Sequence, residues 1–175
     1  MSEESLRLIE EQSLGQQGVK LHLMEIEEVQ LACQRLVEQA VRRVDIFTFD
    51  LDAQLFDRQP FLEAVKQLAI GGPLSQINIL LQDNHRVQTE GHRLLELARR
   101  LTSKIEIRRP HADHIDQLEN YLLADECGYL IRPLYTSYEA STDFNDRYTA
   151  RGMTEKFMKI WECSEPDTVL RRLYL

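Results

Sequence analysis

The feature that most constrains this chain is an alternation of short apolar segments with amphipathic helical segments between residues 19 and 107. Apolar runs of strand length cover residues 44–49 and 77–81. Apolar residues at helical spacing mark residues 26–40 and 61–68. Repeated βα units imply strands joined by right-handed crossovers. The sequence therefore predicts an α/β fold that has a mostly parallel sheet with flanking helices.

The pattern changes after Pro110. Two apolar runs, at 121–124 and 129–131, flank a turn that contains Gly128, and such a pair is typical of a β-hairpin. A last long helical stripe covers residues 153–161. We therefore expect the βα units to be followed by a C-terminal hairpin and one more amphipathic helix.

Length and composition indicate one compact domain. The chain has 175 residues, of which 43% are hydrophobic and 29% are charged, and no low-complexity tract divides it. The first residues are rich in Glu and end at a glycine-bounded turn between Gly15 and Gly18. We expect residues 1–17 to form a mobile or loosely docked arm, and residues 18–175 to form a single domain.

Signals for targeting, metal binding and cofactor binding are missing. The chain starts with Met-Ser-Glu-Glu rather than with the basic and apolar stretches of a signal peptide, and no apolar run is long enough to span a bilayer. The three cysteines form no CxxC pair, and no glycine-rich phosphate-binding motif occurs. We expect a cytoplasmic protein with reduced thiols, no cofactor and no membrane partner.

The formal net charge of −8 bears on the choice of partner. Proteins bind nucleic acid mainly by neutralising phosphates with Lys and Arg, and an acidic surface repels a polyanion. The charge therefore predicts that nucleic acid is not a partner of this chain.

From residue 19 to about residue 162, the order of the expected elements resembles one half of the phospholipase D-like superfamily. In that family the first hairpin strand carries the motif HxKxxxxD, in which the His is nucleophile or acid, the Lys binds phosphate and the Asp orients the His. When Asp125 is aligned with the Asp of this motif, Leu118 stands in place of the His and Asn120 in place of the Lys. The chain is most similar to a bacterial family of uncharacterised phospholipase D-like domains that lack the motif.

The resemblance implies a scaffold without the chemistry of the superfamily, because covalent phosphoryl transfer needs a nucleophile and a cation that holds the phosphate. Our first hypothesis is a noncatalytic module that binds a protein or a small ligand. The second hypothesis is a divergent phosphoesterase or nuclease whose acid and base are supplied by His85, His111 and His114.

Two groups of polar residues are candidate ligand-binding positions. Asp83 and His85 follow an expected inner strand, and ligands of parallel sheets bind beyond the carboxyl ends of strands. His111 and His114 lie among carboxylates, but they lack the third ligand of a zinc motif, so no metal site is expected. The hairpin region adds side chains suited to recognising anions or peptides, namely Arg132, Tyr135 and Arg151.

The resemblance also has a consequence for the oligomeric state. Catalytic phospholipase D-like proteins place two copies of the half-fold side by side, whereas this chain resembles one copy. The resemblance therefore implies a homodimer built around a two-fold axis. The apolar residues expected to border its interface are Leu118, Tyr121, Ile131 and Leu134.

Overall fold

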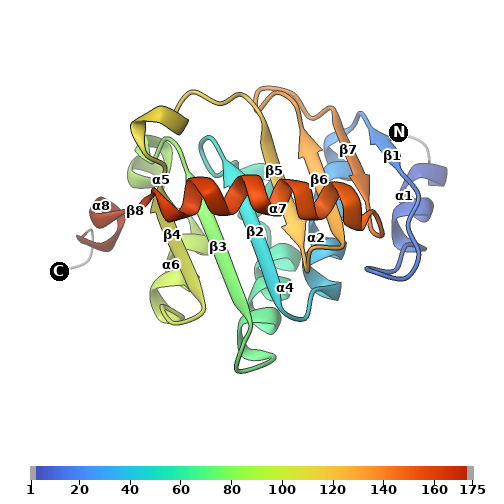
Figure 1. The fold of residues 1–175 in the computed structure, drawn as a ribbon, viewed down its shortest axis with the longest axis horizontal. Coiled ribbons are helices and arrows are strands. Elements are labelled where there is room, and N and C mark those ends of the chain that lie inside the picture. The colour runs from blue at the N-terminus through green and yellow to red at the C-terminus, as the bar shows by residue number, and fades with distance from the viewer. Residues whose placement is uncertain (1–2, 173–175) are drawn as a thin grey trace.

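The computed structural model describes residues 3–172, and its centre is a twisted sheet (Figure 1). Across the described residues the sheet has eight strands in the order β1-β7-β6-β5-β2-β3-β4-β8. The strands are β1 (Leu21–Leu23), β2 (Arg43–Thr48), β3 (Gln76–Leu81), β4 (Ile105–Arg109), β5 (Asn120–Ala124), β6 (Gly128–Arg132), β7 (Ala140–Asp143) and β8 (Glu165–Pro166). The helices are α1 (Glu3–Glu10), α2 (Ile26–Gln39), α3 (Ala53–Phe56), α4 (Gln59–Ile70), α5 (His85–Glu90), α6 (Arg93–Arg100), the 3-10 turn η1 (Ala112–His114), α7 (Arg147–Glu162) and α8 (Thr168–Arg172).

The mixed α/β class is confirmed, but the prediction of a mostly parallel sheet is wrong. β2, β3 and β4 run parallel, as the βα periodicity implied. All other neighbouring strands in the described part of the chain are antiparallel. The reason is that β5, β6 and β7 form an antiparallel meander beside β2, and β1 pairs with β7 at the far edge of that meander.

Helices cover the two faces of the sheet unequally. α2, α4 and α6 lie on one face, and α7 crosses the other face (Figure 1). Successive residues of a strand point to opposite faces, so Ile46 packs in the core beside α2 and α4, whereas Phe47 packs beneath α7. The second core is smaller and aromatic, because Tyr121, Phe157 and Trp161 join Phe47 there.

Several helices begin at recognisable start signals. Pro60 lies in the first turn of α4, where the missing N–H has no cost. The carboxylate of Asp146 accepts a hydrogen bond from the Thr149 N–H at 3.0 Å and so caps α7.

None of the helices in residues 3–172 is both long and apolar enough to cross a bilayer. The cytoplasmic location stays a prediction.

The N-terminal segment contributes α1, which lies beside α2 in the structure (Figure 1). Ile9 in this helix is fully buried and belongs to the larger core. Gly18 then passes so close to β7 that an added Cβ would overlap the carboxylate of Asp143. Residues 1–2 and 173–175 lie outside the described part of the chain. The division into an arm over 1–17 and a domain over 18–175 stays a prediction.

Candidate functional site

The residues aligned with the phospholipase D motif lie at the two ends of β5. Leu118 precedes the strand and is 55% exposed, whereas Asn120 opens it and is 4% exposed. The Asn120 Oδ1 atom accepts a hydrogen bond from the Phe49 N–H at 3.0 Å, which ties β5 to the end of β2. This end of the strand therefore presents an apolar side chain and a structural amide, without an imidazole or an ammonium group at either position.

Asp125 follows β5 at its other end, far from Leu118 along the strand. Its carboxylate accepts hydrogen bonds from the backbone N–H groups of Val41, Arg42 and Arg43, at 2.7, 2.9 and 2.7 Å. These bonds tie the β5–β6 turn to the start of β2. Asp125 therefore binds the backbone at the start of β2, whereas the pocket described below lies beyond the end of this strand.

Arg132 ends β6 and is only 2% exposed. Its Nε donates to the Ser137 carbonyl at 2.9 Å and its Nη2 donates to the Tyr135 carbonyl at 2.7 Å. The guanidinium also lies 4.8 Å from the centre of the Tyr138 ring. Arg132 thus organises the loop between β6 and β7 from inside the protein.

Tyr138 connects this loop to α3. Its hydroxyl donates to the Asp52 Oδ2 atom at 3.0 Å, and the Asp52 Oδ1 atom caps α3 by accepting from the Gln54 N–H. Burial and then the bond to Asp52 raise the pKa of Tyr138 to about 12. The tyrosine is therefore a neutral hydrogen-bond donor at physiological pH.

A surface pocket of about 310 Å³ lies where the three parallel strands end. We call it the strand-end pocket, and its lining residues are Phe49, Gln82, Asp83, Asn84, Arg109, Ile115 and Asp116. Phe49 follows β2, Gln82 follows β3, and Arg109 is the last residue of β4. The carboxyl ends of parallel strands are a common position for ligands. The pocket therefore occupies the part of this fold best placed to bind a small molecule.

The walls of the strand-end pocket are held by contacts outside it. The Gln82 side chain donates to the Gln117 carbonyl at 2.9 Å and accepts from the Gln117 N–H at 3.0 Å. The Asn84 amide donates to the Asp167 carboxylate at 2.8 Å. The ring of Phe49, another lining residue, stacks on Tyr135 with ring centroids 4.0 Å apart. These contacts fix the shape of the pocket before any ligand arrives.

The charged side chains of Asp83 and Arg109 make fewer hydrogen bonds and ion pairs than the amide side chains of the pocket do. Asp83 accepts a hydrogen bond from the His85 N–H at 2.8 Å through Oδ1, and its Oδ2 atom accepts none from the described residues 3–172. The Arg109 side chain is exposed and makes neither an ion pair nor a hydrogen bond with any residue from 3 to 172. The pocket thus combines one unpaired cation with the carboxylates of Asp83 and Asp116.

The structure brings some of the expected site residues together and separates others. Asp83 lines the strand-end pocket, and His85 is its near neighbour at the start of α5. His111 precedes η1 and His114 is its last residue, and the His111 Nδ1 atom accepts from the Asp113 N–H at 3.3 Å. Within residues 3–172, no three His, Cys, Asp or Glu side chains are grouped to hold a metal ion.

The other expected positions lie elsewhere. Arg132 is buried, Tyr135 supports the pocket through Phe49, and Arg151 is exposed on α7, which covers the opposite face of the sheet from α2 and α4. Sequence reasoning missed Arg109 as a pocket residue. The sequence could have indicated Arg109, because it follows the strand expected at 105–107. Asp83 was chosen because ligands bind beyond the carboxyl ends of parallel strands, and Arg109 has the same position relative to its strand.

A family model described as a domain of unknown function, DUF7931, matches residues 25–173. The chain belongs to the DUF7931 family. The match covers the sheet strands from β2 to β8 and the helices around them. No curated protein matches this DUF7931 chain by sequence.

Solved structures share the fold of the DUF7931 domain. Nuc from Salmonella typhimurium, a phospholipase D family member, has a TM-score of 0.61 at 12% identity, covering 86% of this chain and 98% of Nuc. NucT from Helicobacter pylori has a TM-score of 0.60 at 11% identity, covering 86% of this chain and 99% of NucT. At these identities the likeness shows the fold alone, which is phospholipase D-like.

A third structure is that of TrmBL2, an archaeal chromatin protein whose structure shows a novel mode of DNA binding. The TM-score is 0.62 at 20% identity, and the match covers 84% of this chain. The DUF7931 chain spans about half of TrmBL2, at 52% of its length. This comparison overturns the expectation that nucleic acid is excluded as a partner. Net charge was the wrong criterion, because it averages over the whole surface and is silent about any one face.

Proposed function

We propose that this DUF7931 domain is a noncatalytic phospholipase D-like module that binds a small polar ligand in the strand-end pocket. The observation that carries the proposal is the exposed guanidinium of Arg109, which has no ion-pair or hydrogen-bond partner among residues 3–172 and lies in a pocket whose walls are held by other contacts. A guanidinium forks two hydrogen bonds to a carboxylate or a phosphate, so the ligand would carry such a group.

The noncatalytic part of the proposal rests on Leu118 and Asn120. A nucleophile needs a side chain that can attack phosphorus, and a phosphate needs a cation beside it. Leu118 offers no such atom, and the oxygen of Asn120 is bonded to the Phe49 N–H. Leu118 is an exposed apolar residue and Asn120 is a structural amide, so neither supplies what the reaction needs.

Ligand binding can be tested by titrating isotope-labelled protein with inorganic phosphate and with succinate, each followed by amide NMR shifts. We expect shifts at Gln82, Asp83 and Asn84 at millimolar ligand, and their loss in the Arg109→Gln variant. Arg100→Gln is the matched control, because Arg100 is also exposed but does not line this pocket. Titrations that leave the pocket amides unmoved, or that move them equally in Arg109→Gln, would contradict the proposal.

The alternative of a divergent phosphoesterase or nuclease needs its own test. His85, His111 and His114 would supply the acid and base, and none of them lines the strand-end pocket. We expect no turnover of bis(4-nitrophenyl) phosphate above the buffer rate. Turnover that survives repurification and disappears in His111→Ala would favour the enzyme over the binding module.

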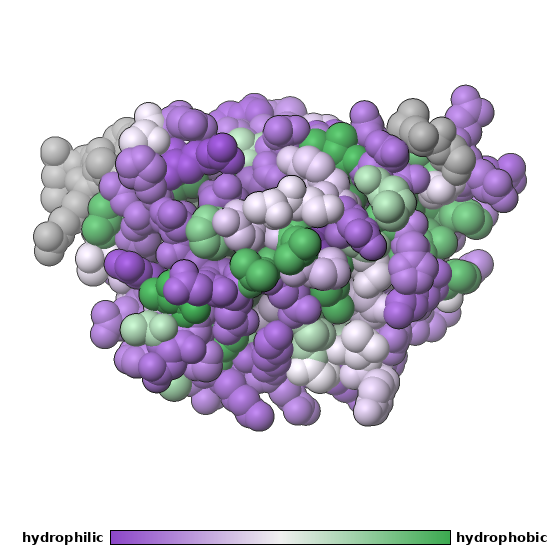
Figure 2. All heavy atoms as spheres, turned by 90° about the horizontal axis from the view of Figure 1, so that it is seen from above, coloured by the Kyte–Doolittle hydropathy of each residue, from purple (hydrophilic) through white to green (hydrophobic). Residues whose placement is uncertain are grey.

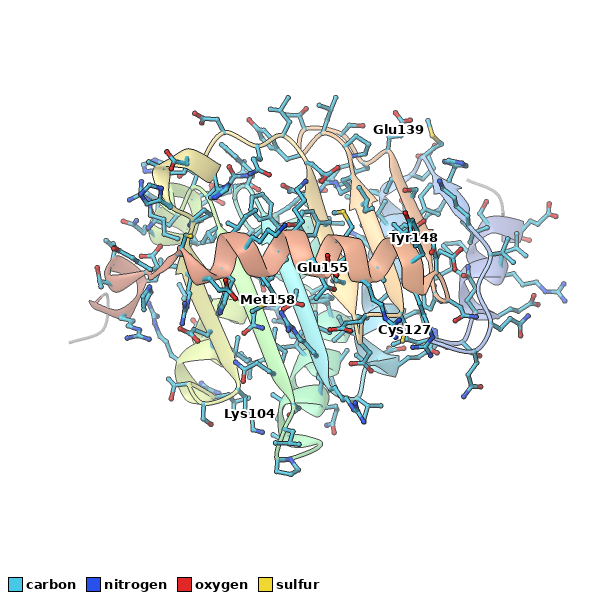
Figure 3. The ribbon with its side chains drawn as sticks, viewed as in Figure 1. Lys104, Cys127, Glu139, Tyr148, Glu155 and Met158 are labelled. Carbon is cyan, nitrogen blue, oxygen red and sulfur yellow. The ribbon has the colours of Figure 1, made fainter. Side chains whose placement is uncertain are left out.

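DNA binding is a second candidate function, and the fold shared with TrmBL2 is the observation that favours it. The exposed residues of α7 include Arg147, Tyr148, Arg151 and Lys159. Tyr148 is 93% exposed and lies on the outer side of this helix (Figure 3). Cationic side chains can pair with the phosphates of a nucleic acid, and an exposed aromatic ring can stack on its bases. Glu155 lies on the same helix and lowers the net positive charge of this surface.

Fluorescence anisotropy with a labelled DNA duplex tests this second candidate. DNA binding through α7 would give a dissociation constant of about 10⁻⁴ to 10⁻⁶ M that weakens with salt. The double variant Arg151→Glu, Lys159→Glu would remove it, while Arg100→Glu, which changes the charge elsewhere, would retain most of it. A flat titration of the wild-type protein at low salt would eliminate DNA binding through α7.

We also propose that the domain pairs with a second copy of itself. Leu118 and Leu134 support this, because they are 55% and 46% exposed and their segments are joined by the Tyr135 N–H bond to the Leu118 carbonyl. Figure 2 views this edge of the molecule and shows apolar side chains among hydrophilic ones. Tyr121 is only 2% exposed beneath α7, so the proposed interface does not include it.

A further inference from the structure

Two buried residues with unpaired hydrogen-bond donors line one small cavity. The Asn120 Nδ2 and Arg132 Nη1 atoms are buried, and neither has a hydrogen-bond partner among residues 3–172. Their side chains are 4% and 2% exposed. Both line a cavity of about 10 Å³, together with the Cys33 thiol and with apolar side chains that include Leu55 and Leu130. The two orphan donors therefore share one space.

The orientation of Asn120 is fixed by its other contact. Its Oδ1 atom accepts from the Phe49 N–H at 3.0 Å, so the two amide hydrogens must point away from Phe49. Exchanging the oxygen and the nitrogen would place an NH₂ group against an N–H group. The donor identity of the atom that faces the cavity thus follows from the hydrogen bond.

Arg132 is fixed in the same way. Nε and Nη2 donate to the carbonyls of Ser137 and Tyr135, which leaves Nη1 as the free end of the guanidinium. The nearest carboxylate oxygen, Oδ2 of Asp52, lies 3.7 Å from Nη1, which exceeds hydrogen-bond distance. That oxygen already accepts the Tyr138 hydroxyl. Asp52 therefore balances the charge of Arg132 without satisfying its last donor.

The remaining lining of the cavity does not supply a strong acceptor side chain. Burial raises the pKa of the Cys33 thiol to about 12, so the sulfur stays protonated. Leu55, Phe56 and Leu122 are apolar. Tyr121 also lines the cavity, and its hydroxyl has no hydrogen-bond partner among residues 3–172, but its ring packs with Phe157 on the opposite face of the sheet from Asn120, so it is not the missing acceptor. Buried donors in folded proteins are almost always paired, either with protein or with an ordered small species. The cavity thus needs an acceptor that comes from outside the chain.

We propose that Asn120 and Arg132 together bind one ordered water molecule inside the fold, because the cavity is too small for a chloride or bromide ion. About 10 Å³ is the space that one water occupies in such a cavity. The bound species would link the first residue of β5 to the last residue of β6, which face each other in the sheet. It would thereby complete the polar network beneath Leu118.

Crystals of the full chain grown in sodium bromide test the proposal and distinguish water from a halide ion. We expect an electron-density peak about 2.7–3.4 Å from both the Asn120 Nδ2 and the Arg132 Nη1 atoms. A peak without an anomalous signal at the bromine edge identifies water, whereas a peak with that signal identifies a halide ion and overturns the proposal. A featureless cavity, or direct bonds from both nitrogens to protein atoms, overturns the proposal.

A variant removes one donor while keeping the contact with Phe49. In Asn120→Asp one carboxylate oxygen can still accept from the Phe49 N–H, and the other replaces the donor that faces Arg132. We expect the peak to disappear, because the carboxylate takes the Nη1 hydrogen. Asn145→Asp, an exposed amide change, should leave the peak in place. A peak that persists unchanged in Asn120→Asp would show that the proposed donor does not hold it.

Discussion

At the residue scale, several polar side chains of this domain serve the backbone. Asp125 binds three backbone N–H groups at the start of β2, Asn120 binds one beyond its end, and Arg132 binds two carbonyls of the following loop. Buried polar groups are stable only when such partners are present. The residues around the motif positions are therefore constrained by the fold.

Replacing Asp125 should destabilise the protein through its three hydrogen bonds. Asp125→Asn keeps one acceptor oxygen and tolerates the positive φ of 51° at this position, so we expect a loss of about 1–2 kcal/mol in the free energy of unfolding. Asp125→Ala removes every bond and adds backbone strain, so its loss should reach about 3 kcal/mol. Urea denaturation measures both. Asp113→Asn, at a side chain that is 82% exposed, should stay near wild type.

Restoring the motif residues should harm the fold without producing activity. In Leu118→His with Asn120→Lys, the Lys replaces a side chain that is 4% exposed, and the Phe49 N–H loses its acceptor. A buried ammonium without a partner is costly, so we expect a loss of at least about 3 kcal/mol in stability. The single change Leu118→His, at an exposed position, should be nearly neutral. Phosphodiesterase turnover by a stable double variant would contradict this prediction.

The pH dependence of stability should carry a contribution from Asp45. Burial raises the pKa of this carboxyl group, although Arg43 and Asn78 act against the shift. A raised pKa means that the folded state keeps its proton when the unfolded state has lost it near pH 4. Relative to Asp45→Asn, the wild-type protein should therefore lose stability as the pH rises above about 4. Parallel pH curves for the two proteins would exclude this contribution.

At the element scale, the β5–β6 hairpin has an unusual turn. Asp125 and Glu126 have φ values of 51° and 56°, the left-handed region that favours Gly. Two consecutive residues of this kind are typical of a type I′ turn, for which Asp-Gly is a preferred pair. The hydrogen bonds of Asp125 thus hold the register of the hairpin, and the turn tolerates Glu126 at a position that favours Gly.

Glu126→Gly should stabilise the hairpin. Gly relieves the left-handed strain at the exposed position 126, which is worth about 1 kcal/mol after its own entropic cost is included. Thermal unfolding should show a midpoint a few degrees above that of the wild type. Glu126→Ala removes the same carboxylate but keeps a Cβ, so it should not produce the gain. Equal effects of the two changes would assign the effect to charge.

The elements themselves could largely be predicted from the sequence, because periodicity reports which residues a strand or helix buries. The apolar run from Val44 to Phe49 and the helical stripe around Phe157 both correspond to observed elements. The order of strands could not be predicted, since the pairing of β1 with β7 joins segments far apart in the chain. Only part of the pocket could be predicted, for the same reason. Asp83 follows a strand that the sequence predicted, but Phe49 and Arg109 reach the pocket from the ends of other strands.

At the scale of the whole molecule, the proposed homodimer gives a direct prediction. Size exclusion with light scattering should give about twice the chain mass of 20.5 kDa at micromolar concentration. The double variant Leu118→Glu, Leu134→Glu should shift the mass toward that of one chain, because like charges would meet across a two-fold axis. Val41→Glu, at an apolar residue that is 73% exposed elsewhere, is the control. A wild-type mass of 20.5 kDa that is unchanged on concentration would rule the dimer out.

The pairing of β1 with β7 also determines when this protein can finish folding. Leu21 pairs with Thr142, so roughly 120 residues separate the two partners. During synthesis β1 leaves the ribosome early and must wait until nearly the whole chain has followed, whereas β2 and β3 can pair much sooner. Until β7 arrives, the N-terminal segment has no sheet edge of its own to join. The segment that forms β1 therefore stays without its sheet partner for longer than β2 or β3 does.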